Sequence, residues 1–181
     1  PLAAPVADVA VREVDLLADS GIAVNAAGPL LVRADPVRHR MVAADTLTST
    51  ITLVDTRSGE VRNVFTGHRA LQHLKAEALA VRAATGTVYL AADLAFVVVE
   101  PDTGRVDAVP TDVQLEAVAV DEATGNAFAV GRASADLAFW DGARRRLRWL
   151  PWTPPSAPLA NENQTPPPPI RKVVALPSET A

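Results

Sequence analysis

Short apolar runs, each followed by a turn-forming stretch, recur along the middle of this chain. The repeated unit is an apolar run that ends in an acidic residue, then a turn, then a second run rich in apolar residues. It is found at Ile51–Val64 (ITLVDTRSGEVRNV), Phe96–Val109 (FVVVEPDTGRVDAV) and Leu137–Leu150 (LAFWDGARRRLRWL). The acidic residues Asp55, Glu100 and Asp141 are 45 and 41 residues apart. One strand–turn–strand hairpin at such a period is typical of a β-propeller.

The same pattern predicts twelve short strands in three units of four. The expected strands are Leu30–Arg33, Met41–Ala44, Thr50–Val54 and Val61–Phe65 in the first unit; Leu79–Arg82, Val88–Ala92, Phe96–Val99 and Val106–Val109 in the second; and Ala117–Val120, Ala127–Val130, Leu137–Trp140 and Leu147–Leu150 in the third. Phe96–Val99 is apolar at every position, which indicates a strand covered on both faces by neighbouring sheets.

Three units are too few for a closed ring, because known propellers have at least about four blades. The flanking runs Val11–Leu17 and Ile170–Leu176 also read as strands, and together they could complete a fourth blade. We favour the alternative that the remaining blades lie elsewhere, since the chain starts at Pro1 without Met and ends just after a strand. The predicted fold class is therefore all-β, with about three to four four-stranded antiparallel blades that form part of a larger or composite β-propeller.

Composition divides the chain into four parts. Residues 1–10 are an Ala/Pro-rich lead-in, residues 11–150 are the propeller blades, and residues 170–181 are a terminal strand with its tail. Between the last two, residues 151–169 contain eight prolines. Such a stretch favours an extended linker or surface arm, with a ligand for a proline-reading module as the alternative.

Charge and composition narrow the range of partners. Hydrophobic residues make up 49% of the chain, which indicates a folded domain. The net charge of −4 offers no general attraction for nucleic acid or an anionic membrane surface. No apolar run reaches the roughly 20 residues that span a bilayer. We therefore expect no nucleic acid partner and no membrane span.

Cysteine is absent, which removes disulfides, thiolate metal sites and cysteine nucleophiles from consideration. Together with the missing initial Met, this favours an exported bacterial protein, periplasmic or secreted, with a cytosolic location as the alternative.

Two propeller repeat families resemble this chain over about residues 11–150. The turns Asp55–Gly59, Pro101–Gly104 and Asp121–Gly125 are similar to the D-x-x-[ST]-G turns of YVTN-type and quinoprotein-like repeats. Gly67-His68 and Trp140-Asp141 stand where WD40 repeats carry their GH and WD dipeptides, although in different units. The resemblance implies a rigid multi-bladed platform, usually for binding.

Motifs for catalysis or a cofactor are absent from the sequence: we find no nucleophile elbow, P-loop, dinucleotide fingerprint or zinc-protease helix. His39, His68 and His73 lack carboxylates at ligand-like spacing, so we expect no metal site. The three recurring acids, which end apolar runs, are expected to accept backbone N–H bonds in turns; a cation-binding ring around a central channel is the alternative. We predict no catalytic residue and no resident cofactor.

The chain has one basic cluster, surrounded by tryptophans. The interpretation that we favour is a solvated turn with Trp149 packed between blades. Basic and aromatic side chains together also suit a protein-binding patch, or as a last alternative nucleic acid. We also expect the arginines to be exposed, because they sit in the turn of the third hairpin. The candidate partner-binding residues are Arg144, Arg145, Arg146, Trp149 and Trp152.

Two functions follow from this architecture. The first is a non-catalytic propeller scaffold, a protein-interaction subunit whose partner could carry the remaining blades. The second is a propeller enzyme or electron-transfer component, quinoprotein-like or lactonase-like, with its site in the central funnel. Binding of a carbohydrate or another small ligand is a weaker third alternative.

Overall fold

The structure is a computed structural model, and it describes residues 30–45, 48–66, 78–131 and 136–152. These residues form twelve strands in three four-stranded antiparallel sheets, with no helix among them. The first sheet contains β1 (Leu30–Asp35), β2 (Arg40–Asp45), β3 (Thr50–Asp55) and β4 (Val61–Phe65); the second contains β5 (Leu79–Val81), β6 (Val88–Ala92), β7 (Ala95–Glu100) and β8 (Arg105–Pro110); the third contains β9 (Leu115–Val120), β10 (Ala127–Gly131), β11 (Asp136–Asp141) and β12 (Arg146–Pro151).

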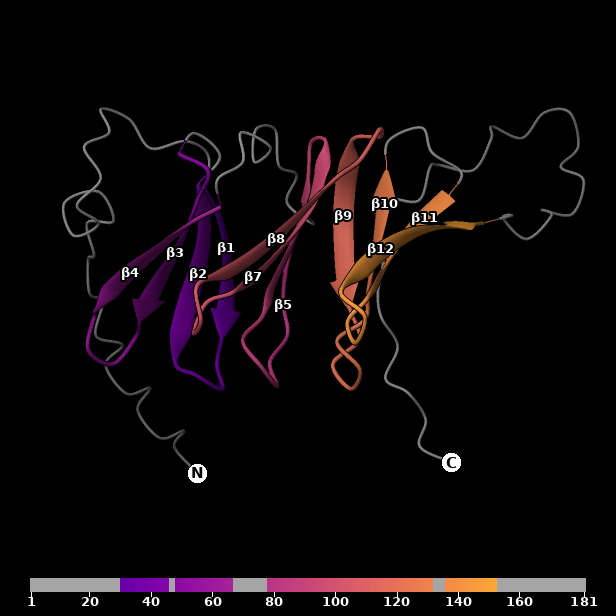
Figure 1. Ribbon diagram of the computed structural model, residues 1–181. Coiled ribbons are helices and arrows are strands. Elements are labelled where there is room, and N and C mark those ends of the chain that lie inside the picture. Colours follow the sequence, from indigo (N-terminus) through magenta and orange to yellow (C-terminus); the bar gives the residue numbers. More distant parts are fainter. Residues whose placement is uncertain (1–29, 46–47, 67–77, 132–135, 153–181) are drawn as a thin grey trace, which may run out of the picture.

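Each sheet is a simple meander, in which every strand pairs with its neighbour in sequence. The three sheets stand side by side in a row, from β1–β4 through β5–β8 to β9–β12 (Figure 1). The predicted all-β fold of three four-stranded units is confirmed, and the sheets are stacked like the blades of a propeller. The three sheets of the described residues do not close into a ring.

The expected strand positions are confirmed in all three units, and most strand ends agree to within one residue. β1 ends two residues later than expected, at Asp35, and the start of β9 differs for a physical reason. β9 begins at Leu115, two residues earlier than expected, because a β-bulge shifts the register between Val130 and Gly131. The register skips Glu116, so that Leu115 lies opposite Gly131. The extra residue returns Leu115 to the buried face, where it is 2% exposed, and it also breaks the alternation that marks a strand in the sequence.

Several sequence predictions fall outside the described residues. They include the flanking strands Val11–Leu17 and Ile170–Leu176, and all of the proline-rich stretch after Trp152. The fourth blade that these strands could form therefore stays a prediction. Pro151 itself belongs to β12, so the last blade extends one residue further than expected.

Two apolar cores join the sheets. The core between the first and second sheets is aliphatic and includes Ile51 and Leu53 from the first sheet and Leu90 and Val97 from the second. The core between the second and third sheets is aromatic: the rings of Phe96 and Trp140 lie 5.8 Å apart. The second sheet thus has both faces covered, which explains why β6 and all but the last residue of β7 are buried.

Four turns share one backbone design. In each, a glycine with a φ between +71° and +76° ends the turn, and its N–H donates to the carbonyl of the residue four positions earlier, at 2.7–2.9 Å. A left-handed φ costs little only for glycine, which explains the turn sequence. The glycines are Gly59, Gly86, Gly104 and Gly125.

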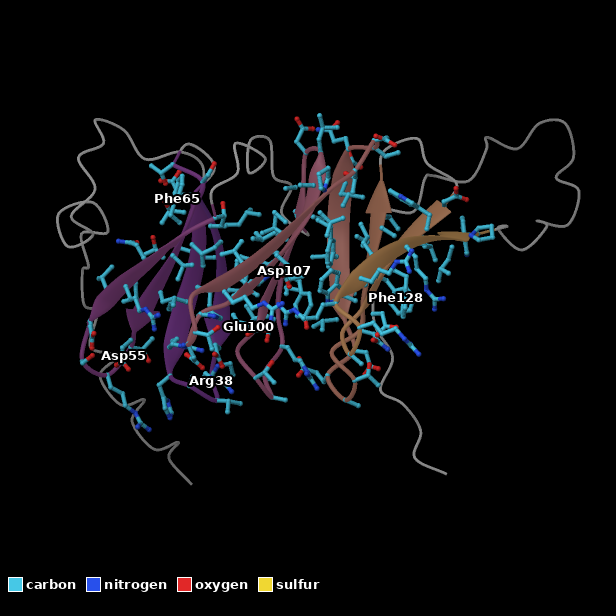
Figure 2. The ribbon with its side chains drawn as sticks, viewed as in Figure 1. Arg38, Asp55, Phe65, Glu100, Asp107 and Phe128 are labelled. Atoms are coloured by element: carbon cyan, nitrogen blue, oxygen red, sulfur yellow. The ribbon has the colours of Figure 1, made fainter. Side chains whose placement is uncertain are left out.

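The six turns that join an odd-numbered strand to the next lie along the same side of the row of sheets, which we call the turn end (Figure 1). Arg38 and Asp55 belong to turns at this end, whereas Phe65 lies toward the opposite end of the first sheet (Figure 2). The connections between sheets start and finish away from the turn end.

Candidate functional site

The predicted basic cluster is split by the fold. Arg144 is highly exposed, with 80% of its side chain accessible, and its Nη1 donates to Oδ2 of Asp141 at 2.8 Å. Arg146 on β12 is exposed too, whereas Trp152 is half-buried. Trp149 is 38% exposed, so it is not enclosed between sheets.

Arg145 points in another direction from Arg144 and Arg146, which corrects the expectation that all arginines of this turn are exposed. Its backbone is left-handed, with a φ of 52°, and only 26% of its side chain is accessible. The guanidinium binds Glu100 and Asp107 of the second sheet, and its Nε lies 2.7 Å from Oδ2 of Asp107. Burial disfavours the charge of Arg145, but these hydrogen bonds outweigh it and raise its pKa above the ordinary value.

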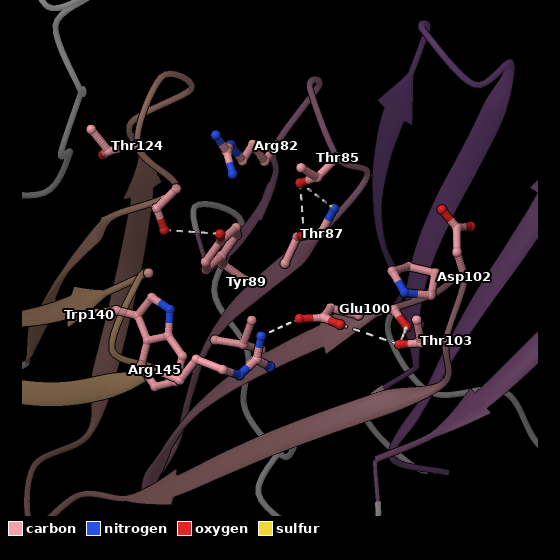
Figure 3. A pocket seen from close by; sticks show the side chains of 14 residues that line it. Arg82, Thr85, Thr87, Tyr89, Glu100, Asp102, Thr103, Thr124, Trp140 and Arg145 are labelled. Atoms are coloured by element: carbon pink, nitrogen blue, oxygen red, sulfur yellow. Dashed lines mark hydrogen bonds and ion pairs between the residues drawn. The ribbon is translucent and has the colours of Figure 1, made fainter.

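A pocket of about 320 Å³ lies beside Arg145, where four turns of the second and third sheets converge (Figure 3). Tyr89 and Trp140 contribute aromatic rings, and four threonines contribute hydroxyls. The hydroxyl of Tyr89 donates to the carbonyl of Gly125 at 3.1 Å. Burial raises the pKa of Tyr89, so the phenol keeps the proton that it donates.

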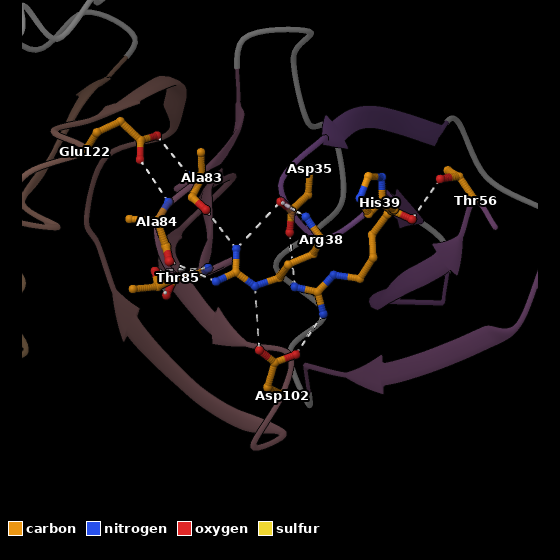
Figure 4. Close-up of polar contacts among 11 residues, drawn as sticks. Asp35, Arg38, His39, Thr56, Ala83, Ala84, Thr85, Asp102 and Glu122 are labelled. Carbon is orange, nitrogen blue, oxygen red and sulfur yellow. Dashed lines mark hydrogen bonds and ion pairs between the residues drawn. The ribbon is translucent and has the colours of Figure 1, made fainter. Parts of the chain in front are cut away.

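Arginine side chains connect the turns of successive sheets. Arg38, in the β1–β2 turn, donates from Nη1 and Nη2 to the carbonyls of Ala83 and Ala84, each at 2.8 Å (Figure 4). Asp102 approaches the same guanidinium, with 3.9 Å between Oδ2 and Nε. The planar fork of an arginine can satisfy two neighbouring carbonyls at once, which a lysine cannot do.

The second arginine repeats this contact one sheet further along. Arg82 donates from Nε and Nη2 to the carbonyls of Glu122 and Ala123, each at 2.9 Å. In return, the carboxylate of Glu122 accepts the N–H groups of Ala83 and Ala84, at 3.0 and 3.3 Å. The β5–β6 turn is therefore held on both sides, by Arg38 and by Glu122.

A buried carboxylate supports the first of these contacts. The side chain of Asp35 is fully buried at the end of β1, and it accepts hydrogen bonds from Arg38 N at 3.3 Å and Arg40 Nη2 at 3.1 Å. Arg40 also pairs with Asp102 of the second sheet, at 2.7 Å between Nη1 and Oδ1. The sequence marks Asp35-Pro36 only as a turn, and nothing local reveals the ion pairs.

Two of the three recurring acids cap turns as predicted. Asp55 Oδ1 accepts the N–H groups of Ser58 and Arg57, at 2.7 and 2.8 Å, and these bonds lower its pKa. The pKa of Asp141 is lowered by the hydrogen bonds from the side chain and then the N–H of Arg144. The alternative of a cation-binding ring is not supported: no cluster of three metal-ligating side chains occurs in the part of the chain that is described.

Glu100 departs from the capping prediction. Its backbone carbonyl closes the turn, but its side chain binds Arg145 and the Thr103 hydroxyl instead of backbone N–H groups. Asp121 takes the capping role in the third sheet: hydrogen bonds from the Thr124 hydroxyl, at 2.5 Å, and then from Ala123 N–H lower its pKa.

Of the three histidines, only His39 is described, and its Nε2 lies 2.6 Å from Nη2 of Arg57.

The third sheet has an apolar far face, which points away from the second sheet. The rings of Phe128 and Phe139 pack on this face at 5.1 Å, and the guanidinium carbon of Arg148 lies 4.7 Å from the centroid of the Phe139 ring. These rings belong to neither of the two cores that join the sheets. The apolar residues of the far face are Ala117, Ala119, Phe128, Val130, Leu137, Phe139 and Leu150.

The opposite end of the row is more polar. On the far face of the first sheet, the Thr52 hydroxyl donates to Oδ1 of Asn63 at 2.8 Å. Val32 on the same face is 43% exposed. The two ends of the row thus offer different surfaces, and Figure 2 shows Phe65 and Phe128 far apart along it.

The comparisons with known proteins support the fold. No protein-family model matches this chain, and no curated protein matches its sequence. Hydrazine synthase of Kuenenia stuttgartiensis is similar in structure, with a TM-score of 0.57 and 14% identity, over 71% of this chain and 37% of that chain. A protein of unknown function from Bacteroides thetaiotaomicron matches with a TM-score of 0.49 and 14% identity, over 67% and 31% of the two chains.

At such identity, the similarity to hydrazine synthase concerns the fold alone: both chains contain this arrangement of stacked sheets. The present chain spans about 37% of the length of that one. The YVTN and WD40 resemblance stays a prediction. Within the described ranges, no helix is long and apolar enough to cross a membrane.

Proposed function

We propose that this chain is a segment of a β-propeller and acts as a non-catalytic scaffold that binds a protein partner. The occupant of the proposed interface is an apolar β-sheet face of the partner, which supplies further blades. The observation that carries the proposal is the far face of the third sheet, where Phe128 and Phe139 stack outside both cores.

The second sheet already packs against other sheets in the way proposed here. Its two faces are each covered by a neighbouring sheet, through residues such as Val97 on one side and Phe96 on the other. The far face of the third sheet carries the same residue types at alternate positions. Phe128, Leu137 and Leu150 on it are half-buried, so they are the part of the face that remains open to a partner. Burying apolar surface of this kind contributes about 25 cal/mol for each Å². A second blade-like sheet fits it in shape and chemistry.

The edge of this face adds charge specificity. Arg146 and Arg148 lie on the far face along β12, the outermost strand, and both are exposed. A partner with acidic residues along the matching edge would complement them, while its centre remains apolar. Trp149 lies on the opposite face of β12, beside Ala138, and therefore does not belong to this surface.

The test is the native mass of the tagged full chain isolated from the cells that make it. We expect a complex heavier than one chain, and we expect Leu137→Glu to abolish it, because a carboxylate there would be buried against the partner. Val32→Glu, on the far face of the first sheet, is the matched control and should leave the complex intact. A monomer with the natural sequence, or a complex that survives Leu137→Glu, would contradict the proposal.

The competing function, an enzyme or electron-transfer component with a site in the central funnel, stays a prediction from the sequence. The pocket found among the described residues lies between two sheets at the turn end, so it is not evidence for a site in a central funnel.

A further inference from the structure

The pocket between the second and third sheets is built from parts that are distant in sequence. Thr85 and Thr87 reach it from the β5–β6 turn, Thr103 from the β7–β8 turn and Thr124 from the β9–β10 turn, while Trp140 borders it from the end of β11. Figure 3 shows these side chains arranged around one space. Its volume of about 320 Å³ lies at the lower end of the range for small-molecule sites, roughly 300–1,000 Å³.

The charged groups around this pocket already have partners, and Arg82 is bonded to the backbone carbonyls of Glu122 and Ala123. Arg145 binds Glu100 and Asp107, and Asp102 pairs with Arg40 and with Arg38. A charged ligand would have to displace one of these partners and leave it without compensation, which is unfavourable in a partly buried site. The site therefore disfavours anions and cations alike.

Neutral hydrogen-bonding groups, by contrast, retain capacity. Each threonine hydroxyl offers one donor and two acceptor positions. The hydroxyls of Thr85 and Thr87 lie 2.8 Å apart and bond to one another, and Thr85 also accepts the N–H of Thr87. Whichever hydroxyl donates, the pair keeps one free hydroxyl proton and at least one open acceptor position on Thr87. The phenol of Tyr89 uses its proton on the carbonyl of Gly125, and its oxygen can still accept. Several hydroxyls of one ligand could be bound at the same time.

Aromatic rings line the inner part of the pocket. Tyr89 and Trp140 are almost fully buried, so their positions are held by packing against Phe96. The small accessible part of these two rings gives the pocket a rigid apolar border beside its hydroxyls, which suits a ligand with both C–H and hydroxyl groups. A sugar ring has both features.

We propose that this pocket binds a neutral, polyhydroxylated molecule of the size of one monosaccharide. The proposal goes beyond the scaffold function and is independent of it, because the pocket lies on the other side of the third sheet from the partner-binding face. Both sites can therefore be occupied in the same molecule.

The experiment is binding of single sugars to the full chain, measured by saturation-transfer NMR and titration calorimetry. The probes are glucose, galactose and mannose as neutral hexoses, with glucuronate and glucosamine as charged analogues. We expect at least one neutral hexose to bind and to exceed its charged analogues in affinity by about tenfold, since the latter meet paired charges.

A double variant tests the location of the site. Thr85→Val with Thr87→Val keeps the shape of both side chains but removes two hydroxyls, and it should weaken binding by about tenfold. Thr56→Val is the matched control: it removes a turn hydroxyl of the first sheet, bonded to the carbonyl of His39 at 2.8 Å, and should leave the affinity unchanged.

Three results would overturn the proposal. The first is that no neutral hexose binds at millimolar concentration. The second is that glucuronate or glucosamine binds more tightly than all of them, which would indicate an ion site. The third is that the double variant binds as well as the natural sequence while both unfold at the same temperature.

Discussion

Arg38 and Arg82 make the same contact one sheet apart. Each guanidinium spans two consecutive backbone carbonyls in the first turn of the next sheet, at Ala83 and Ala84 or at Glu122 and Ala123. The accepting carbonyls are 39 residues apart, about the repeat period of the chain. The register between neighbouring sheets is therefore set by arginine–carbonyl bonds at the turn end as well as by the apolar cores.

These contacts predict that lysine cannot replace either arginine. Arg82→Lys should lower the free energy of unfolding by about 1 kcal/mol, because one ammonium cannot span both carbonyls and the exposed turn loses a charged hydrogen bond. Urea denaturation would measure the loss. Arg105→Lys is the control, since the Arg105 side chain is 55% exposed and its ion pair with Asp107 is long, at 3.5 Å. Equal losses in the two variants would count against the special role of Arg82.

Neighbouring arginines in the last hairpin should behave differently. Arg145→Ala removes the bonds to Glu100 and Asp107 and should destabilise the fold by about 1–2 kcal/mol, a value reduced by partial solvent exposure. Arg144→Ala removes an ion pair on the surface and should leave the unfolding temperature within error of the natural sequence. The comparison is a pair of thermal melts, and a larger loss for Arg144→Ala would refute the assignment.

Two glycines allow backbone strain to be separated from crowding. Both Gly104 and Gly125 have positive φ, but a Cβ at Gly104 would meet nothing within 4 Å, whereas one at Gly125 would lie 2.6 Å from Nη1 of Arg82. Gly104→Ala should cost about 1–2 kcal/mol, from the left-handed conformation alone.

Gly125→Ala should cost about 1–2 kcal/mol more than Gly104→Ala, because Arg82 must move and release its carbonyls. Chemical denaturation of both variants would measure the difference. Identical losses would show that Arg82 adjusts freely and that its contacts add little.

The capped acids predict a loss of stability in acid. The pKa values of Asp55, Asp121 and Asp141 are lowered in the folded state, so below their ordinary value of about 3.9 the unfolded chain binds more protons than the folded one. The stabilisation they provide is complete above that pH and is lost as the pH falls through the folded values. Urea denaturation at a series of pH values should show this decline.

Asp141→Asn provides the check on this pH dependence. The variant keeps a turn-capping side chain but has no carboxylate to titrate, so its stability should vary less steeply with pH in the acid range. A slope as steep as that of the natural sequence would mean that other groups cause the acid sensitivity.

The strands and turns were predictable from the sequence because their signals are local. Alternation over five or six residues marks a strand such as Val61–Phe65, and a glycine four residues after Asp55 marks the turn that Asp55 caps. The strand start at Leu115 was missed because a bulge breaks the alternation there. The apolar run at Phe96–Val99 correctly indicated a strand with both faces covered.

The candidate site was less predictable, since residues that are adjacent in sequence took different environments. Arg144, Arg145 and Arg146 read as one basic cluster, yet the left-handed backbone of Arg145 turns its side chain toward Glu100, 45 residues earlier. The pocket likewise joins residues that only the stacking of sheets brings together, and so do the bonds of Arg38 and Arg82 to the carbonyls of the next sheet.

Local patterns in the chain therefore specify where it extends, where it turns and which positions alternate between two faces. These local patterns do not determine which face of a strand packs against another sheet, because that depends on side chains about 40 positions away. Packing of the three sheets supplied this information: it enclosed Trp140, left Phe128 on a far face, and placed Arg145 between two carboxylates instead of in solvent.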